Sequence, residues 1–113
     1  MPKDDSVRLR HMLDASKEAV SFIKKQTRPS LDGNRMLALS LVRCIEIVGE
    51  AASQVTQECR LSNPQIPWPE IVAMRNRLIH AYFDIDLDRV WDTVKDDLPP
   101  LILHLEKIIS KNK

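Results

Sequence analysis

The sequence predicts an all-α protein, an antiparallel bundle of four to five helices that occupies residues 1–113 as a single domain. Apolar residues recur at steps of three and four over long stretches, which is the spacing of a buried helix face. The chain has only two glycines, too few for the repeated tight turns of a β-sandwich or barrel. Its 113 residues are enough to enclose one hydrophobic core and too few for a second domain.

The first predicted helix begins near Asp4, Asp5 and Ser6, whose side chains offer N-cap chemistry. Apolar residues then recur with helical spacing until the Arg-Pro-Ser segment at residues 28–30, which is expected to stop the helix. The Leu-Asp-Gly-Asn segment at residues 31–34 predicts a turn.

A second, long helix is predicted over residues 35–60, which contain no Gly-Pro break. Its first half is apolar almost all the way round and is interrupted only by a narrow polar stripe, made of Ser40, Arg43, Glu46 and Glu50. Such a helix needs neighbours on more than one side, and a second copy of the molecule is one source of that cover. We therefore expect a homodimer.

The third predicted helix follows a proline-containing loop at residues 61–69. It is expected to run from about Trp68 to about Ala81, because a proline early in the first turn of a helix is tolerated.

The fourth predicted helix follows a connector at residues 84–86, and either Asp86 or Asp88 can cap it. Its apolar residues form a stripe at three- and four-residue steps from residue 90 to residue 108. Pro99 and Pro100 fall inside this stripe, so the last helix is expected to be kinked or split there.

Charge and cysteine usage indicate the environment of the protein. The formal net charge of +1 provides no general basic field, so any nucleic-acid contact has to be local. Cys44 and Cys59, if they share one helix, would lie about 22 Å apart along it, too far for a disulfide. The N-terminal residues begin no apolar signal segment, and no stretch is apolar enough to span a bilayer. We expect a cytoplasmic protein with free thiols and no membrane contact.

A helical wheel of the third predicted helix places Arg75 at the centre of its apolar arc. Asn76 and His80 lie one turn apart on the adjoining edge, and Tyr82 returns close to Arg75 if the helix lasts that long. An arginine among apolar neighbours must reach solvent, pair with a carboxylate or open into a cleft where it meets an anion. Glu46 and Glu50 are the candidate carboxylate partners.

These side chains suit phosphodiester cleavage. The planar guanidinium of arginine fits a phosphate and neutralises charge that develops in the transition state. Histidine titrates near neutrality and can exchange a proton with a ribose 2′-hydroxyl or a leaving 5′-oxygen, while Asn76 could fix the ring tautomer. The residues alone also allow a structural reading, in which Arg75 pairs with Glu46 or Glu50 and His80 favours a helix C-terminus.

No metal site or cofactor is expected. Asp84, Asp86 and Asp88 imitate the start of a calcium-binding loop, but Arg89 and Lys95 stand where that loop needs a glycine and its final glutamate. The other two histidines, His11 and His104, have no ligand partners at useful spacing. Two glycines, at positions 33 and 49, also exclude a glycine-rich phosphate loop.

The segment from Arg75 to Tyr82, Arg-Asn-Arg-Leu-Ile-His-Ala-Tyr, resembles the R-x4-H-x-Y signature of the HepT toxins within the HEPN ribonuclease superfamily. Further blocks are similar to the same family: Ile47–Ala52, Pro67–Trp68, Tyr82–Leu87, Val90–Trp91 and Asp97–Leu101. The resemblance covers nearly the whole chain in order and length. It implies a helical bundle that dimerises to form a composite, metal-independent ribonuclease site.

The resemblance also implies residue roles and a partner. Arg75 and His80 would be catalytic and Asn76 would support them. HepT toxins are paired with a minimal nucleotidyltransferase antitoxin, MntA, which transfers AMP to the motif tyrosine. Tyr82 would then be the modified residue, and the added phosphate would occupy the place that the RNA phosphate needs.

The expected function is therefore that of an endoribonuclease toxin that cuts RNA as a homodimer and is neutralised by AMP transfer. The alternative is a non-catalytic helical module that docks on a nucleotidyltransferase and binds a nucleotide or phosphate through the Arg75 edge. The near-neutral charge favours this alternative, because a general RNA-binding protein is expected to be more basic.

Overall fold

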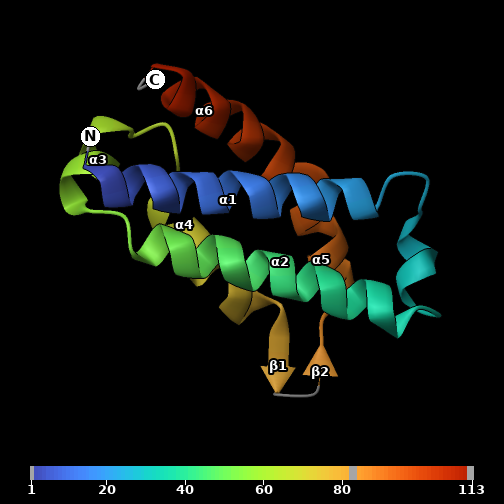
Figure 1. Ribbon diagram of the computed structural model, residues 1–113. Helices are drawn as coiled ribbons and strands as arrows, with labels where there is room; N and C mark the ends of the chain where they lie inside the picture. The colour runs from blue at the N-terminus through green and yellow to red at the C-terminus, as the bar shows by residue number, and fades with distance from the viewer. Residues whose placement is uncertain (1, 82–83, 112–113) are drawn as a thin grey trace.

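The computed structural model describes residues 2–81 and 84–111, and in this part of the chain the all-α prediction is confirmed. Helices α1 (Lys3–Phe22) and α2 (Arg35–Ser53) lie side by side and antiparallel, and α6 (Leu98–Lys111) packs on α1 (Figure 1). Three short helices complete the bundle: α3 (Gln57–Ser62), α4 (Trp68–Ala73) and α5 (Leu87–Asp92).

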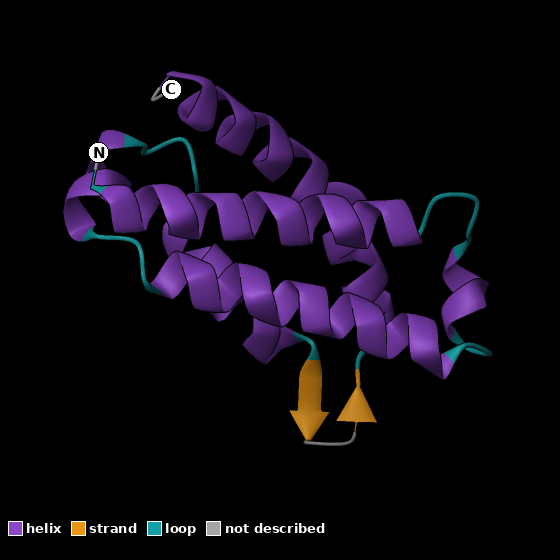
Figure 2. Ribbon diagram, in the orientation of Figure 1, coloured by secondary structure: helices purple, strands orange, loops and turns teal. Residues whose placement is uncertain are grey.

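The exception to the helical architecture is a two-stranded antiparallel hairpin, β1 (Ile79–Ala81) with β2 (Asp84–Ile85). It projects from one side of the bundle, beneath α2 and α4 in the view of Figure 2. These strands differ from the prediction, which has residues 79–81 in a helix and residues 84–86 in a connector. The strands are short, and Ile85 of β2 is partly buried against the helical core.

The core fills the space between α1, α2 and the C-terminal helices. Its largest fully buried side chains come from every layer of the bundle: Leu9, Met12, Leu41, Ile45, Val48, Val90, Val94, Leu98 and Leu105. These residues recur at three- and four-residue steps along their helices, which is why each helix turns one face inward. The stripe predicted for the last helix is thus confirmed as core, with Trp91 half-buried at its edge.

The first predicted helix ends earlier than expected, at Phe22, and a separate 3₁₀ turn spans Arg28–Leu31. Lys25 adopts a left-handed φ of 66°, a conformation that cannot continue a right-handed helix. The expected cap also differs: Pro2 is the N-cap residue, and Asp4 and Asp5 lie in the first turn.

The prediction of one helix over residues 35–60 is wrong, because α2 ends at Ser53 and α3 begins at Gln57. Thr56 caps α3, its hydroxyl oxygen accepting a hydrogen bond from the Cys59 amide at 3.2 Å. Arg60 reaches back and donates to the Ala52 carbonyl at 3.0 Å, at the end of α2. These bonds satisfy the backbone groups that a continuous helix would have paired internally.

The break also removes the argument that separated the two cysteines along one helix. Cys44 lies in α2 and Cys59 in α3, and both are buried free thiols.

The last predicted helix is interrupted, as expected, near its prolines. Asp86 caps α5 by accepting a hydrogen bond from the Arg89 amide at 3.0 Å. A π-helical segment, Thr93–Asp97, then separates α5 from α6, which begins directly before Pro99 and Pro100. Widening the helix here is one way to accommodate prolines that cannot donate backbone hydrogen bonds.

Neighbouring helices of the same chain cover most of α2: α1 on one side, and α4 and α5 on the other. Two apolar side chains at its N-terminal end stay exposed, Met36 at 81% and Leu39 at 44%. None of the helices in the described part of the chain is long and apolar enough to cross a membrane.

Candidate functional site

The structure places the residues of the candidate site on two kinds of backbone. Arg75 and Asn76 lie in a 3₁₀ turn, Met74–Arg77, that follows α4, and His80 lies in strand β1. The prediction of a helix to Ala81 is therefore wrong, as are the wheel positions derived for His80. Tyr82 lies outside the described residues. The role of each residue stays a prediction.

The helix ends here because the backbone finds other partners. The Asp86 amide donates to the Leu78 carbonyl at 2.6 Å, and Ile79 pairs with Ile85 across the hairpin. Backbone groups that would form the next hydrogen bonds of the helix are thus paired across the hairpin instead. The 3₁₀ turn also has three residues per turn instead of 3.6, which changes the direction of each side chain.

As a result, Arg75 does not occupy the centre of a buried face. Met74 is 2% exposed and fills that place, with Ile71 and Leu78 buried beside it. The side chain of Arg75 is 56% exposed. The change from α-helix to 3₁₀ turn thus exposes Arg75, which the sequence predicts to lie among apolar neighbours.

Arg75 nevertheless has a carboxylate partner on α2. Its Nε donates to Glu46 Oε2 at 2.9 Å, and the Glu46 side chain is 29% exposed. Of the two candidate glutamates, the ion pair involves Glu46; Glu50 forms no ion pair with Arg75 in the described part of the chain. This geometry leaves both Nη nitrogens of Arg75 without a hydrogen bond to any described residue. A guanidinium held through Nε keeps the fork that binds a phosphate in bidentate fashion.

The next arginine, Arg77, serves the local structure. Its Nη2 donates to the Glu70 carbonyl at 2.8 Å, which ties the 3₁₀ turn to the start of α4. Desolvation raises the pKa of Asp97 above its usual value, and the positive charge of Arg77 opposes that rise. Arg77, which is exposed like Arg75 and Asn76, is thus hydrogen-bonded to the backbone of α4.

Close packing fixes the distance between Arg75 and α2. A Cβ atom added to Gly49 would lie 3.3 Å from the Ile71 carbonyl oxygen and 3.4 Å from that of Val72. Gly49 therefore allows α4 to approach the backbone of α2 closely. The approach brings the turn after α4 within reach of Glu46, which lies one turn before Gly49 on α2.

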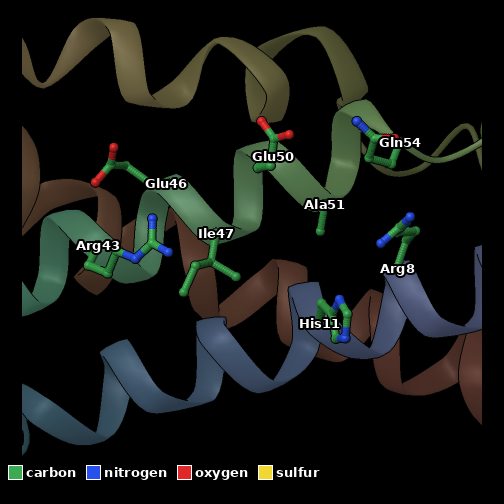
Figure 3. A pocket seen from close by; sticks show the side chains of 8 residues that line it. All are labelled: Arg8, His11, Arg43, Glu46, Ile47, Glu50, Ala51 and Gln54. Carbon is green, nitrogen blue, oxygen red and sulfur yellow. The ribbon is translucent and has the colours of Figure 1, made fainter.

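A cavity of about 330 Å³ opens between α1 and α2 next to this ion pair (Figure 3). Ile47 and Ala51 contribute apolar surface, and polar side chains surround them: Arg8, His11, Arg43, Glu46, Glu50 and Gln54. Glu46 belongs both to the cavity and to the ion pair with Arg75. Arg43 and Glu50 belong to the polar stripe predicted from the sequence, whereas the sequence does not point to Arg8 and Gln54, because only the pairing of α1 with α2 brings them to the cavity.

His11, for which the sequence predicts no role, also lies at the cavity. Within the described residues, no group of three or more His, Cys, Asp and Glu side chains is arranged to hold a metal ion.

Known proteins are similar to this chain over most of its length. The ribonuclease HepT-like family model matches residues 12–108. A Methanocaldococcus jannaschii protein named "Putative RNase MJ1216" is 34% identical over 111 residues, which cover 97% of this chain and 92% of the relative. A Thermococcus cleftensis protein named "Probable ribonuclease HepT" is 36% identical over 95 residues, covering 80% and 86% of the two chains.

A third relative, "Putative RNase TTE0752" of Caldanaerobacter subterraneus, is 30% identical over 105 residues, covering 93% and 94% of the two chains. No solved structure matches the chain. The family match spans α2, α4 and the turn that holds Arg75, and the relatives match over most of their own length. The chain belongs to the HepT-like ribonuclease family.

Proposed function

We propose that this protein is a metal-independent endoribonuclease, the toxin of a toxin–antitoxin pair of the HepT and MntA type. Its family membership supports ribonuclease activity. The observation that carries the proposal is the exposed guanidinium of Arg75, held through Nε by Glu46 and located five residues before His80. The two Nη nitrogens are available for a phosphate in the described surroundings of the site.

In the proposed reaction, the ribose 2′-oxygen attacks the adjacent phosphorus and the bond from phosphorus to the 5′-oxygen breaks. A base takes the 2′-hydroxyl proton and an acid protonates the leaving 5′-oxygen, so the products are a 2′,3′-cyclic phosphate and a 5′-hydroxyl. Arg75 would bind the scissile phosphate and stabilise its developing charge. His80 would act as base or acid, and Asn76 would support it.

One histidine cannot easily act as base and acid in the same step, so we propose a homodimer in which two copies contribute to one cleft. Met36 and Leu39, exposed at the N-terminal end of α2, support a second copy as a neighbour of this helix. Apolar side chains exposed together favour such a contact.

We further propose that a nucleotidyltransferase of the MntA type neutralises the toxin in the cytoplasm by transferring AMP to Tyr82. Tyr82 follows His80 by two residues in the chain. A phosphodiester there would add negative charge close to the Arg75–His80 motif and compete with the RNA phosphate.

The test is incubation of purified protein with total cellular RNA in the presence of a chelator. Mass spectrometry must first establish that Tyr82 carries no adduct. The wild-type protein should cut RNA and leave 2′,3′-cyclic phosphate ends, while Arg75→Ala and His80→Ala should lower the rate by about 10²- to 10⁴-fold. We expect both variants to stay folded, which circular dichroism checks; for Arg75→Ala the reason is the exposed side chain of Arg75.

Absence of cleavage by unmodified, dimeric protein would contradict the nuclease proposal. It would favour the alternative, a module that binds nucleotide or phosphate at Arg75 while docked on a nucleotidyltransferase. Growth assays provide an independent check, because either variant should no longer inhibit growth if cleavage is the toxic activity.

A further inference from the structure

The cavity between α1 and α2 is lined by more charged side chains than the ion pair between Arg75 and Glu46 uses. Four of its side chains, Arg8, His11, Arg43 and Glu50, make no hydrogen bond or ion pair with their side-chain groups in the described part of the chain. Charged side chains gathered around a concave surface without partners are free to bind a ligand. We infer that the cavity is a nucleotide subsite that recognises a guanine base next to the scissile phosphate. This inference rests on the proposed ribonuclease function for its place in the reaction.

The position of the cavity supports a subsite next to the scissile phosphate. Glu46 lines the cavity and also binds Arg75, so the cavity and the candidate phosphate site share one side chain. Glu50 lies four residues further along α2, about 6 Å beyond Glu46 along the helix axis. A nucleotide whose phosphate meets Arg75 can therefore direct its base into the cavity. A single-stranded RNA is the suitable ligand, since its unstacked bases can enter a pocket.

The shape and surface suit a base. The volume of about 330 Å³ accommodates one nucleobase but not a duplex. Ile47 and Ala51 provide an apolar surface, and Arg8 and His11 lie one turn apart on the facing helix α1 (Figure 3). Guanidinium and imidazole planes are groups on which bases stack. Arg43 lies toward the opposite end of the view from Arg8, so positive charge flanks the apolar surface on both sides.

The acidic side chains distinguish between ligands. Glu46 and Glu50 add carboxylates to a lining that also contains Arg8 and Arg43, a mixture that disfavours a simple inorganic anion and favours a ligand with both hydrogen-bond donors and charge. A carboxylate only accepts hydrogen bonds, and it can accept two in parallel. Guanine is the RNA base with two neighbouring donors, N1–H and N2–H, on its Watson–Crick edge. Glu46 already binds Arg75, so Glu50 is the residue that would select guanine.

The experiment measures nucleotide binding to the full chain, separately from cleavage. GMP, AMP, CMP, UMP and inorganic phosphate are titrated against wild-type protein and Glu50→Gln, with calorimetry for affinity and amide chemical shifts for location. Glu58→Gln is the matched control, an exposed glutamate on α3 outside the cavity. GMP should bind about tenfold tighter than the other nucleotides. Glu50→Gln should lose that preference because an amide offers one acceptor and one donor group, whereas Glu58→Gln should retain it.

The inference is overturned if GMP binds no better than inorganic phosphate or the other nucleotides, or if Glu50→Gln keeps the guanine preference. Cleavage of short oligonucleotides that differ only beside the scissile bond separates this inference from the proposed function. Guanine-selective binding without cleavage would support the subsite and contradict the nuclease. Cleavage with no base preference and no selective GMP binding would support the nuclease and contradict the subsite.

Discussion

Arg75 and Glu46 connect the 3₁₀ turn after α4 to α2 through one hydrogen bond of 2.9 Å between Nε and Oε2. The bond restricts the rotation of a long side chain that would otherwise sample many rotamers. Because it uses Nε, it orients the guanidinium without occupying its two Nη groups. We therefore predict that Glu46 is a positioning residue for the proposed phosphate-binding arginine.

This role predicts different effects for two substitutions of Glu46. Glu46→Ala should lower the rate of RNA cleavage about tenfold by removing the orientation of Arg75. Glu46→Gln should keep most of the activity, because the amide oxygen still accepts from Nε. The measurement is kcat and KM on one oligonucleotide for each variant, with Glu58→Ala as a control on α3. Equal activity of Glu46→Ala and wild-type protein would show that Arg75 needs no such support.

Sequence reasoning succeeded where the deciding interactions are local. Asp86 is one of the two caps predicted for the last helix, with Asp88, because the partner of such a cap, here the Arg89 amide, lies only three residues away. The apolar stripe of the last helix was recognised because the period of a helix is built into the sequence itself. Glu46 was one of two candidate partners for Arg75, since both glutamates lie on one stripe of α2, and only the structure distinguishes them.

Sequence reasoning failed where distant residues decide the local structure. α2 ends at Ser53 because Arg60 binds its last carbonyls and because Asp5, 51 residues away, binds Thr56. The helix after Trp68 ends early because Asp86 pairs with Leu78. No helix wheel of a single segment can include such partners. For the same reason, the cavity between α1 and α2 could not be predicted from either helix alone.

Gly49 is predicted to set the separation of α2 and α4. Alanine there gains about 1 kcal/mol of helix propensity, but its Cβ must fit 3.3 Å from the Ile71 carbonyl oxygen, so Gly49→Ala should be close to neutral. Gly49→Val adds further bulk against the same backbone and should lower the free energy of unfolding by about 2 kcal/mol. Denaturant unfolding of both variants checks this. A valine variant as stable as wild-type protein would mean that α4 can shift freely.

Asp5 is predicted to be a major contributor to stability although it is charged and lies near the N-terminus. It is 1% exposed, and its two carboxylate oxygens accept hydrogen bonds from the Thr56 amide at 3.0 Å and the Thr56 hydroxyl at 2.7 Å. Asp5→Ala removes the charged acceptor of both Thr56 donors. It should lower the free energy of unfolding by about 2 to 3 kcal/mol.

Asp4→Ala is the matched control for that measurement, because Asp4 is exposed in the same first turn. It should change stability by no more than about 0.5 kcal/mol, the scale of a helix-dipole effect at the surface. Equal losses in the two variants would indicate that the helix dipole, rather than the bonds to Thr56, accounts for the effect of Asp5.

Cys44 predicts a pH dependence at the alkaline end. Burial, with a smaller contribution from the hydrogen bond to Glu18, raises the pKa of the Cys44 thiol to about 11. The folded protein therefore holds this proton more tightly than the unfolded chain, whose thiol has a pKa of about 9. The corresponding stability is fully present below pH 9 and is lost as the pH rises toward 11. Urea unfolding of wild-type protein and Cys44→Ala should show a difference that shrinks by on the order of 2 kcal/mol over this interval.

The same pKa predicts the reactivity of the thiol. The thiolate is the reactive form, and Cys44 is 2% exposed, so iodoacetamide at pH 8 should leave it unmodified in the folded protein. In urea, both cysteines should react at the rate of ordinary thiols. Rapid alkylation of Cys44 in the folded state, located by peptide mass mapping, would mean that α1 and α2 separate more readily than their packing indicates. Slow alkylation that accelerates with pH only toward 11 would instead report the raised pKa directly.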